Sequence, residues 1–244
     1  MDRFDQKFLS IKEAARYLGV SVATLRRWDN EGSFKASFVT PGGQRRYALS
    51  DLEMKTKGLF RLAQEWAQSE IPTIPENAFY CATSDRFKAR HERMANEIVQ
   101  NDSWQQIASL ISSATGEIGN NSFDHNLGNW PDSPGVFFAY DFGKKHIVLA
   151  DRGVGLLTTL RLIKPDLSTH QEALCVAFTE VLTGRAPEHR GNGLKYVRSA
   201  LTLARANLTY QSGDALLEIR KDNPDLLVTP TNAHIRGTLS FITF

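Results

Sequence analysis

A carboxylate and an amide lie one helical turn apart near the middle of the 244-residue chain, an arrangement that suits activation of water beside a metal ion. Glu117 and Asn121 are four residues apart, so on a helix their side chains share a face. Apolar residues at helical spacing around them predict that helix. A carboxylate can polarise water, and an amide oxygen can bind a hard cation such as Mg²⁺. The same pair is common on solvated helices, so other segments must decide.

Three later segments carry glycines where a ligand needs a close approach to the backbone. Residues 151–155 read Asp-Arg-Gly-Val-Gly and follow a strand-like run. Residues 190–193 read Arg-Gly-Asn-Gly and open a helical pattern, where free backbone N–H groups favour a phosphate. Residues 237–238, a Gly-Thr pair, begin the terminal strand. Each segment is common alone, but their order is not.

The four boxes in this order resemble the ATP-binding (Bergerat) fold of the GHKL superfamily, which includes DNA gyrase, heat-shock chaperone ATPases, MutL and sensor histidine kinases. The resemblance covers roughly residues 85–244. It implies ATP and Mg²⁺ as cofactors and an α/β sandwich. We expect this region to be a mixed sheet with helices on one face.

The resemblance also implies a role for each matching residue. Glu117 would orient or deprotonate the attacking water, Asn121 would hold magnesium, and Asp151 would accept a hydrogen bond from the adenine amino group. Asn120 leaves the metal ligand ambiguous by one residue, although helical phase relative to Glu117 favours Asn121. Arg152 departs from the family's pattern. The other implied cofactor-binding positions are Gly153 and Gly155 in the pocket wall, Arg190, Gly191 and Gly193 over the phosphates, and Thr238 near the adenine.

Composition places the chain among globular proteins and locates a basic excess at its front. Apolar residues make up 41 % and aromatic residues 10 %. No apolar run is long enough for a membrane span or a signal peptide, and two cysteines are too few for a disulfide framework, so we expect a cytoplasmic protein without membrane contact. Residues 1–57 carry eleven Lys or Arg against seven Asp or Glu. This excess predicts an anionic partner for the front end.

The front end reads as a helix-turn-helix. Ser10 and Glu13 form a capping-box pattern, and an apolar stripe follows up to Gly19. Ser21 then caps a second helix, residues 22–31. Two short helices separated by so few residues indicate a DNA-binding motif.

Side chains on the second helix and on the following hairpin are expected to contact DNA. Val22, Leu25 and Trp28 are better read as core than as a surface for stacking bases. A glycine-turned hairpin tip at residues 40–47 adds a basic wing. The expected DNA-binding residues are Thr24, Arg26 and Arg27 on the helix, and Arg45, Arg46 and Tyr47 on the wing.

This run resembles the winged helix-turn-helix of the MerR family over about fifty residues. The resemblance implies base reading by the second helix, phosphate contacts by the wing, and a homodimer formed by a long helix after the wing. Residues 59–68 are the candidate for that helix, or else for a helix that docks onto the second region. Two prolines near residues 69–79 indicate a boundary. We expect a DNA-binding domain at 1–57, a helix and linker at 58–79, and an ATP-binding domain at 80–244.

These inferences predict an α+β, double-stranded-DNA-binding regulator whose activity is coupled to ATP and magnesium binding or to slow ATP hydrolysis. The alternative is a phosphotransferase related to histidine or serine kinases. His91 lies too close to Glu117 for the dimerisation domain of histidine kinases, and is better read as an exposed surface histidine. The alternative therefore needs a separate protein partner as substrate. A third reading is a decayed nucleotide fold that serves as a protein-interaction surface.

Overall fold

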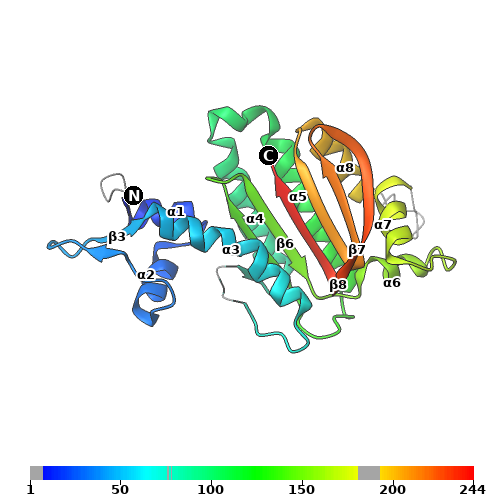
Figure 1. Cartoon of the computed structure of the whole chain (residues 1–244), viewed down its shortest axis with the longest axis horizontal. Helices are drawn as coiled ribbons and strands as arrows, with labels where there is room; N and C mark the ends of the chain where they lie inside the picture. The colour runs from blue at the N-terminus through cyan, green and yellow to red at the C-terminus, as the bar shows by residue number, and fades with distance from the viewer. Residues whose placement is uncertain (1–7, 76, 78, 181–192) are drawn as a thin grey trace.

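The computed structural model describes residues 8–75, 77, 79–180 and 193–244. The chain is α+β, as the sequence predicts, with a helix-turn-helix region at one end and a larger sheet with helices at the other (Figure 1). Helix α3, Leu49–Gln68, runs from the first region onto the sheet. The expected division at residue 57 falls inside this helix, and the division into three parts stays a prediction.

The two N-terminal helices begin at the caps that the sequence predicts. In α1, Ile11–Tyr17, the Ser10 hydroxyl accepts a hydrogen bond from the Glu13 N–H, and the Glu13 carboxylate accepts one from the Ser10 N–H. Helix α2, Val22–Glu31, begins at Ser21, whose hydroxyl accepts a hydrogen bond from the Thr24 N–H over 3.0 Å. These bonds satisfy backbone groups that a helix end otherwise leaves unpaired, which is why local sequence identifies both starts.

The wing is part of a small antiparallel sheet of order β1-β3-β2. The hairpin turns at Gly43, whose φ of 75° is left-handed and favours glycine. Helix α3 starts directly after β3, so the wing and α3 are joined without a loop. The three strands are β1 (Phe8–Ser10), β2 (Phe38–Val39) and β3 (Arg45–Ala48).

The larger sheet has five strands in the order β4-β5-β6-β8-β7, and every neighbouring pair is antiparallel. The expectation of a mixed sheet is therefore wrong. Strands β7 and β8 form a hairpin, and β8 pairs with β6; had β7 taken that place, the pair would have been parallel. The strands are β4 (Tyr80–Cys81), β5 (Val136–Asp141), β6 (His146–Asp151), β7 (Asn207–Arg220) and β8 (Asn223–Thr243).

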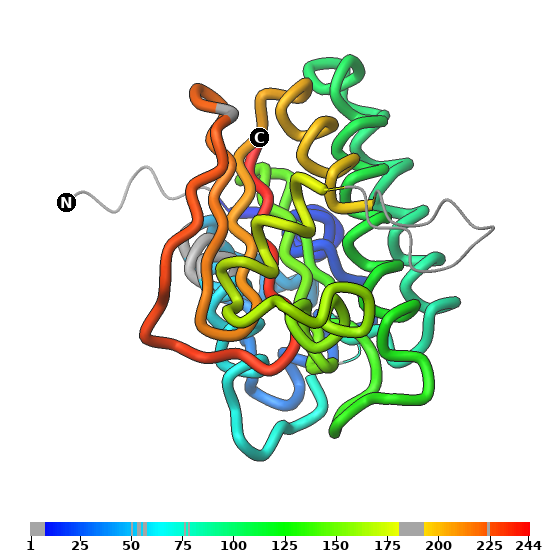
Figure 2. Tube along the Cα trace, turned by 90° about the vertical axis from the view of Figure 1, so that its right-hand side faces the viewer, coloured from blue at the N-terminus to red at the C-terminus, as the bar shows by residue number. Residues whose placement is uncertain are grey.

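Helices cover both faces of the larger sheet, so the expectation of helices on one face is also wrong. Helices α4 to α8 contribute to one apolar core with one face of the sheet. Figure 2 shows the path of the chain through these helices and strands. Helix α3 packs on the other face through Leu59, Ala63 and Trp66, because its own apolar stripe must be covered. The helices of the first face are α4 (Ser84–Val99), α5 (Gln105–Asn126), α6 (Gly155–Arg161), α7 (His170–Thr179) and α8 (Gly193–Leu203), with a 3₁₀ turn at Asp102–Trp104.

The contact between α3 and the sheet is the docking alternative expected for residues 59–68. The buried residues of this core come from α3, from the helix-turn-helix and from the strands, so the front end and the sheet share one apolar cluster. Gly19, at the end of α1, also lies against the sheet, because a Cβ there would be 2.8 Å from the carbonyl oxygen of Tyr140. The helix-turn-helix therefore rests on the second region.

Strand β8 includes residues 223–233, which the two prolines of that stretch predict to be a loop. Instead Pro230 lies opposite Ala215 on β7, and Asn223 lies opposite Arg220. This half of β8 pairs with β7 alone, since the pairing with β6 begins at Thr238. A proline on such an edge removes no hydrogen bond from a ladder, which reconciles the prolines with a strand. Across the described ranges, none of the helices is long and apolar enough to cross a lipid bilayer.

Candidate functional site

Helix α2 presents two arginines to solvent from a helix held in place by its opposite side. Arg26 and Arg27 are exposed, whereas Leu25 and Trp28 are fully buried. Thr24 is half-buried, and its hydroxyl lies 2.9 Å from that of the N-cap serine. Arg27 Nε lies 3.9 Å from Glu31 Oε1 in an exposed ion pair. A fixed helix with exposed guanidinium groups suits entry into the major groove, where arginine recognises guanine and phosphate.

The first arginine of the wing is bound to the end of α2. Arg45 donates from Nε to Asp29 Oδ2 over 2.5 Å. The pKa of Asp29 is lowered, first by the backbone N–H of Ala36 and then by Arg45, so this ion pair keeps its charge at neutral pH. Arg46 is half-buried and donates to Gln44 Oε1 over 3.1 Å. In this structure Arg45 fixes the wing against α2, and Arg46 stays near the hairpin tip.

Tyr47 lies in the core of the front end rather than on its surface. Its side chain is 0 % exposed and stacks on Phe34, with ring centroids 5.7 Å apart. Its hydroxyl is buried without a hydrogen-bond partner, and burial raises its pKa. The ring therefore supports the wing from beneath, and we do not carry Tyr47 forward as a DNA contact.

A small pocket opens where α5, β6, α6, β7 and β8 meet. Four positions expected to bind the cofactor line it: Asn121, Asp151, Gly155 and Thr238. They come from segments far apart in the sequence, so the fold brings them together. The other lining residues are Ser122, His125, Asn126, Leu156, Thr159 and Tyr210.

The carboxylate of Asp151 is the most buried polar group of this pocket, at 1 % exposure. Its Oδ2 accepts hydrogen bonds from the hydroxyls of Ser122 (2.8 Å) and Thr238 (2.5 Å). Its Oδ1 accepts one from the N–H of Gly153 (2.8 Å). Burial raises the pKa of Asp151, and these hydrogen bonds oppose that rise. The backbone N–H of Thr238 also lowers the pKa of this carboxyl, so all the donors around the carboxylate are uncharged.

Glycines let the backbone close around this carboxylate. A Cβ at Gly237 would lie 2.2 Å from Asp151 Oδ1, and a Cβ at Gly153 would lie 2.1 Å from Asn126 Oδ1. Gly155 has a φ of 77°, and a Cβ there would lie 2.8 Å from the carbonyl oxygen of Arg236. Any larger residue would force these segments apart, so the pocket depends on glycine at all three positions.

Glu117 and Asn121 meet the first residue of α8 beside the pocket. A Cβ at Gly193 would lie 2.8 Å from Glu117 Oε2 and 3.1 Å from Asn121 Nδ2. Asn121 also lines the pocket, so the carboxylate, the amide and the start of α8 adjoin one space. The two other expected phosphate-binding positions, Arg190 and Gly191, lie outside the described residues.

Sequence reasoning missed three side chains that build the pocket. Ser122 donates to Asp151, and Tyr210 lines the wall. Asn126 accepts a hydrogen bond from the N–H of Val154 over 2.8 Å and thereby holds the loop after β6. A signal was present, because Ser122 and Asn126 continue the buried row of Ile118 at intervals of four. Polar residues within a buried row indicate a polar function.

The arrangement places a hydrogen-bond acceptor at the floor of the pocket and a second carboxylate near its rim. The floor offers an acceptor to an N–H donor, since the neutral donors around Asp151 orient the carboxylate without neutralising it. The rim, with Glu117, Asn121 and a helix start, suits a polar or anionic group. Among the described residues, no group of three or more His, Cys, Asp or Glu side chains is arranged to hold a metal ion.

A family described as a helix-turn-helix domain matches residues 8–54. This range includes α1, α2 and the wing, together with the first residues of α3. The match supports a DNA-binding regulator, and the front end is a helix-turn-helix domain. No curated protein matches the chain.

Proposed function

We propose that the chain is a DNA-binding regulator whose second region binds ATP with Mg²⁺ in a Bergerat-type pocket of the GHKL superfamily. The observation that carries this proposal is the meeting of Asn121, Asp151 and Thr238 at one pocket, although they belong to three separate segments. The fold implied by the resemblance in sequence needs these residues to line one pocket. Three unrelated segments would not be expected to do so.

Asp151 would select the base of the nucleotide. A carboxylate oxygen can accept more than one hydrogen bond, and the 6-amino group of adenine is a donor that would suit it. Guanine carries a carbonyl oxygen at that position, which would face the carboxylate without a proton between them. Thr238 and Ser122 fix the carboxylate for this contact. ATP should therefore bind more tightly than GTP.

Glu117 and Asn121 would act at the phosphate end. Asn121 would bind Mg²⁺ through its amide oxygen, together with oxygens of the nucleotide, since magnesium sites commonly use few protein ligands and substrate phosphates. The ion would neutralise charge on the phosphates when bound. Glu117 would orient or deprotonate a water molecule. The start of α8 at Gly193 brings backbone close to both side chains.

The front end would read DNA as a winged helix-turn-helix of the MerR type. Arg26 and Arg27 on α2 support base or phosphate contacts, and Arg46 supports a wing contact. A homodimer would let two heads recognise two half-sites. Because the apolar face of α3 packs on the sheet, such a dimer would need another surface, or only the exposed side of α3.

Titration calorimetry on the full chain with Mg-ATP and Mg-GTP tests the nucleotide proposal. We expect saturable binding of ATP, at least about tenfold tighter than GTP, which corresponds to about 1.4 kcal/mol. Absence of ATP binding would remove the nucleotide part of the proposal, whereas the helix-turn-helix assignment would be untouched. Equal affinity for ATP and GTP would contradict the role given to Asp151.

The phosphotransferase alternative stays a prediction that needs a separate protein substrate. His91, expected to be an exposed histidine, is half-buried instead, with Nε2 2.7 Å from the carbonyl oxygen of Ser112 and its ring stacked on Phe87. This packing disfavours His91 as a phosphate acceptor. Label retained on protein after incubation with γ-labelled ATP would favour the alternative.

A further inference from the structure

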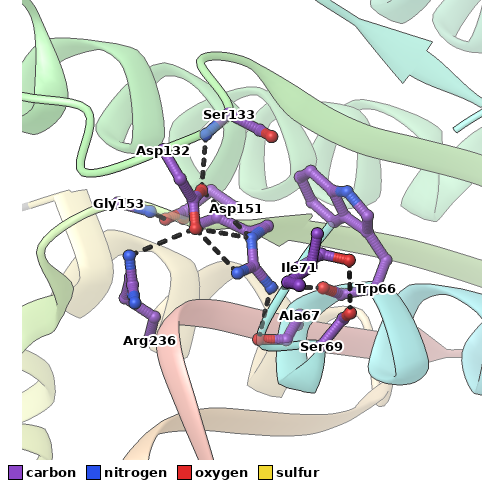
Figure 3. Close-up of polar contacts among 10 residues, drawn as sticks. Trp66, Ala67, Ser69, Ile71, Asp132, Ser133, Asp151, Gly153 and Arg236 are labelled. Atoms are coloured by element: carbon purple, nitrogen blue, oxygen red, sulfur yellow. Dashed lines mark hydrogen bonds and ion pairs between the residues drawn. The ribbon is translucent and has the colours of Figure 1, made fainter. Parts of the chain in front are cut away.

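A buried arginine joins the nucleotide pocket to the end of helix α3. Arg152 follows Asp151 and is 1 % exposed. Its Nη1 donates to the carbonyl oxygens of Trp66 (2.5 Å) and Ala67 (3.2 Å), in the last turn of α3 (Figure 3). The last carbonyls of a helix lack partners within the helix, and a cation there is favourable. Arg152 therefore caps α3 from a different part of the chain.

The same guanidinium forms an ion pair with Asp132, in the connection after α5. Arg152 Nη2 lies 2.7 Å from Asp132 Oδ2, and Arg236 Nη1 lies 3.1 Å from the same oxygen (Figure 3). Burial raises the pKa of Asp132, but hydrogen bonds from Arg152 and the Ser133 N–H outweigh it, so the pKa is lowered overall. Asp132 therefore stays ionised and holds both arginines.

Each of the two arginines is close in sequence to a residue at the floor of the pocket. Arg152 is the chain neighbour of Asp151, and at the end of a strand neighbouring side chains point to opposite faces of the sheet. Asp151 thus faces α5 and the pocket while Arg152 faces α3. Arg236 lies two residues before Thr238, the second hydroxyl donor to Asp151. Movement of either strand end would therefore move the ion-pair cluster.

Helix α3 links this cluster to the DNA-reading head. It is one helix of 20 residues, about 30 Å long at 1.5 Å per residue. Its C-terminal end is held by Arg152, and its N-terminal end follows directly on β3 of the wing. A helix of this length transmits a shift at one end to the other, because its backbone is internally hydrogen-bonded.

We propose that the ion pair of Arg152 and Asp132 couples occupancy of the pocket to the position of α3, with Arg152 as the positioning residue that transmits the change. The proposal rests on nucleotide binding at this pocket. Ordering of the strand ends around the base shifts the Arg152 guanidinium, and this changes how firmly the last turn of α3 is capped. By reciprocity, a displacement of α3 changes nucleotide affinity by the same factor.

Amide hydrogen exchange in the last turn of α3 tests this coupling in the full chain. Residues 62–68 are followed with and without saturating Mg-ATP, while calorimetry measures nucleotide affinity separately. In the wild type we expect exchange to change by about fivefold or more on ATP binding, the low end of typical allosteric coupling. In Arg152→Lys we expect ATP affinity within about threefold of wild type and loss of that response, because lysine lacks the planar fork that serves both carbonyls and the carboxylate.

Arg236→Lys is the matched control. Arg236 also pairs with Asp132, but this ion pair does not involve a residue of α3. It should keep the ATP response. If Arg152→Lys fails to fold, Asp132→Asn replaces it and should weaken the response. A role in stability alone would change the exchange rates equally with and without ATP, leaving their ratio intact.

Two results would overturn the coupling while leaving the proposed function intact. The wild type binds ATP by calorimetry but its α3 exchange does not change, or Arg152→Lys keeps the full response. If calorimetry instead finds no ATP binding by the wild type, the proposed function fails, and the coupling fails with it.

Discussion

The hydroxyl of Thr238 donates to the carboxylate of Asp151 over 2.5 Å, although 87 residues separate them in the chain. The bond lies between β6 and β8, whose register places these two residues opposite each other. Strand pairing therefore positions an expected adenine contact and its supporting hydroxyl together. A pocket on this floor can be tested residue by residue.

Asp151→Asn should weaken ATP binding by at least about tenfold. The amide keeps the shape of the side chain but loses the charge, and a hydrogen bond to a charged group contributes about 1.5–3 kcal/mol. Calorimetry on the folded variant measures the change. Asp222→Asn, an exposed carboxylate at the β7–β8 turn, is the control and should bind like wild type. Unchanged affinity in Asp151→Asn would contradict the adenine contact.

Acidification should weaken ATP binding at a higher pH than an ordinary aspartate would cause. Burial raises the pKa of Asp151 above its usual 3.8, so the carboxyl gains a proton, and loses acceptor capacity, as pH falls through that raised value. The shift acts on folding with the opposite sign: the buried anion destabilises the fold above the raised pKa, and protonation relieves this. Calorimetry measures the ATP association constants of the wild type and of Asp151→Asn from about pH 7 downward. Their ratio cancels the effect of titration of the nucleotide, which is the same for both proteins. A ratio that does not change with pH would contradict this prediction.

Glu117→Gln should separate binding from hydrolysis. Glutamine has the size of glutamate but cannot accept a proton, so the rate of ATP hydrolysis should fall about a hundredfold or more. ATP affinity should stay within a few-fold of wild type, since Glu117 lies near the rim and not at the floor of the pocket. Phosphate release and calorimetry measure the two quantities. Glu92→Gln, an exposed carboxylate on α4, serves as the control.

Tyr47→Phe should leave DNA affinity unchanged and stabilise the fold or leave its stability unchanged. The Tyr47 hydroxyl is buried without a partner, and an unsatisfied buried polar group costs about 1–3 kcal/mol. Removing it while keeping the ring stacked on Phe34 should raise the free energy of unfolding by up to about 1 kcal/mol. Denaturant unfolding and DNA titration test the two halves. Weaker DNA binding would restore the anchoring role that the sequence suggested.

Loss of Arg26 and Arg27 should weaken DNA binding without affecting folding. Both side chains are exposed, so the double alanine variant should unfold like wild type. Binding is measured on a random duplex of about 30 base pairs as the slope of the logarithm of the association constant against the logarithm of the salt concentration. This slope is negative, and its magnitude should decrease by about 0.9 for each phosphate group that the variant no longer neutralises. The control is the double alanine variant of Arg205 and Lys221, which removes the same charge from the second region. If both variants weaken DNA binding equally, the total charge of the protein and not the position of Arg26 and Arg27 would explain the effect.

Local signals in the sequence were enough for the front end. The capping box of Ser10 and Glu13, and the cap at Ser21, predicted where both helices begin, because these bonds form within three residues. The burial of Tyr47 was not predicted, because it depends on packing against Phe34, which lies outside the hairpin.

Long-range pairing was beyond the sequence patterns. Residues 223–233 carry two prolines and read as a loop, yet they extend β8 along an edge where β7 alone supplies hydrogen bonds. The burial of Arg152 depends on Asp132, which lies in a turn-rich connection with no strand or helix signal. Nothing near Arg152 in the sequence indicates that its partners are the carbonyls of α3.

Helix α3 supplies apolar side chains to the sheet and also continues the wing. We therefore expect that neither the DNA-reading head nor the sheet region would fold well without the other. A gene cut at residue 57 would leave part of one helix on each product and expose the apolar strands beneath it. Recombination that exchanged the DNA-reading head for another would succeed only if the donor brought a helix with the same stripe of leucine, alanine and tryptophan. The two halves are therefore expected to evolve as a single unit.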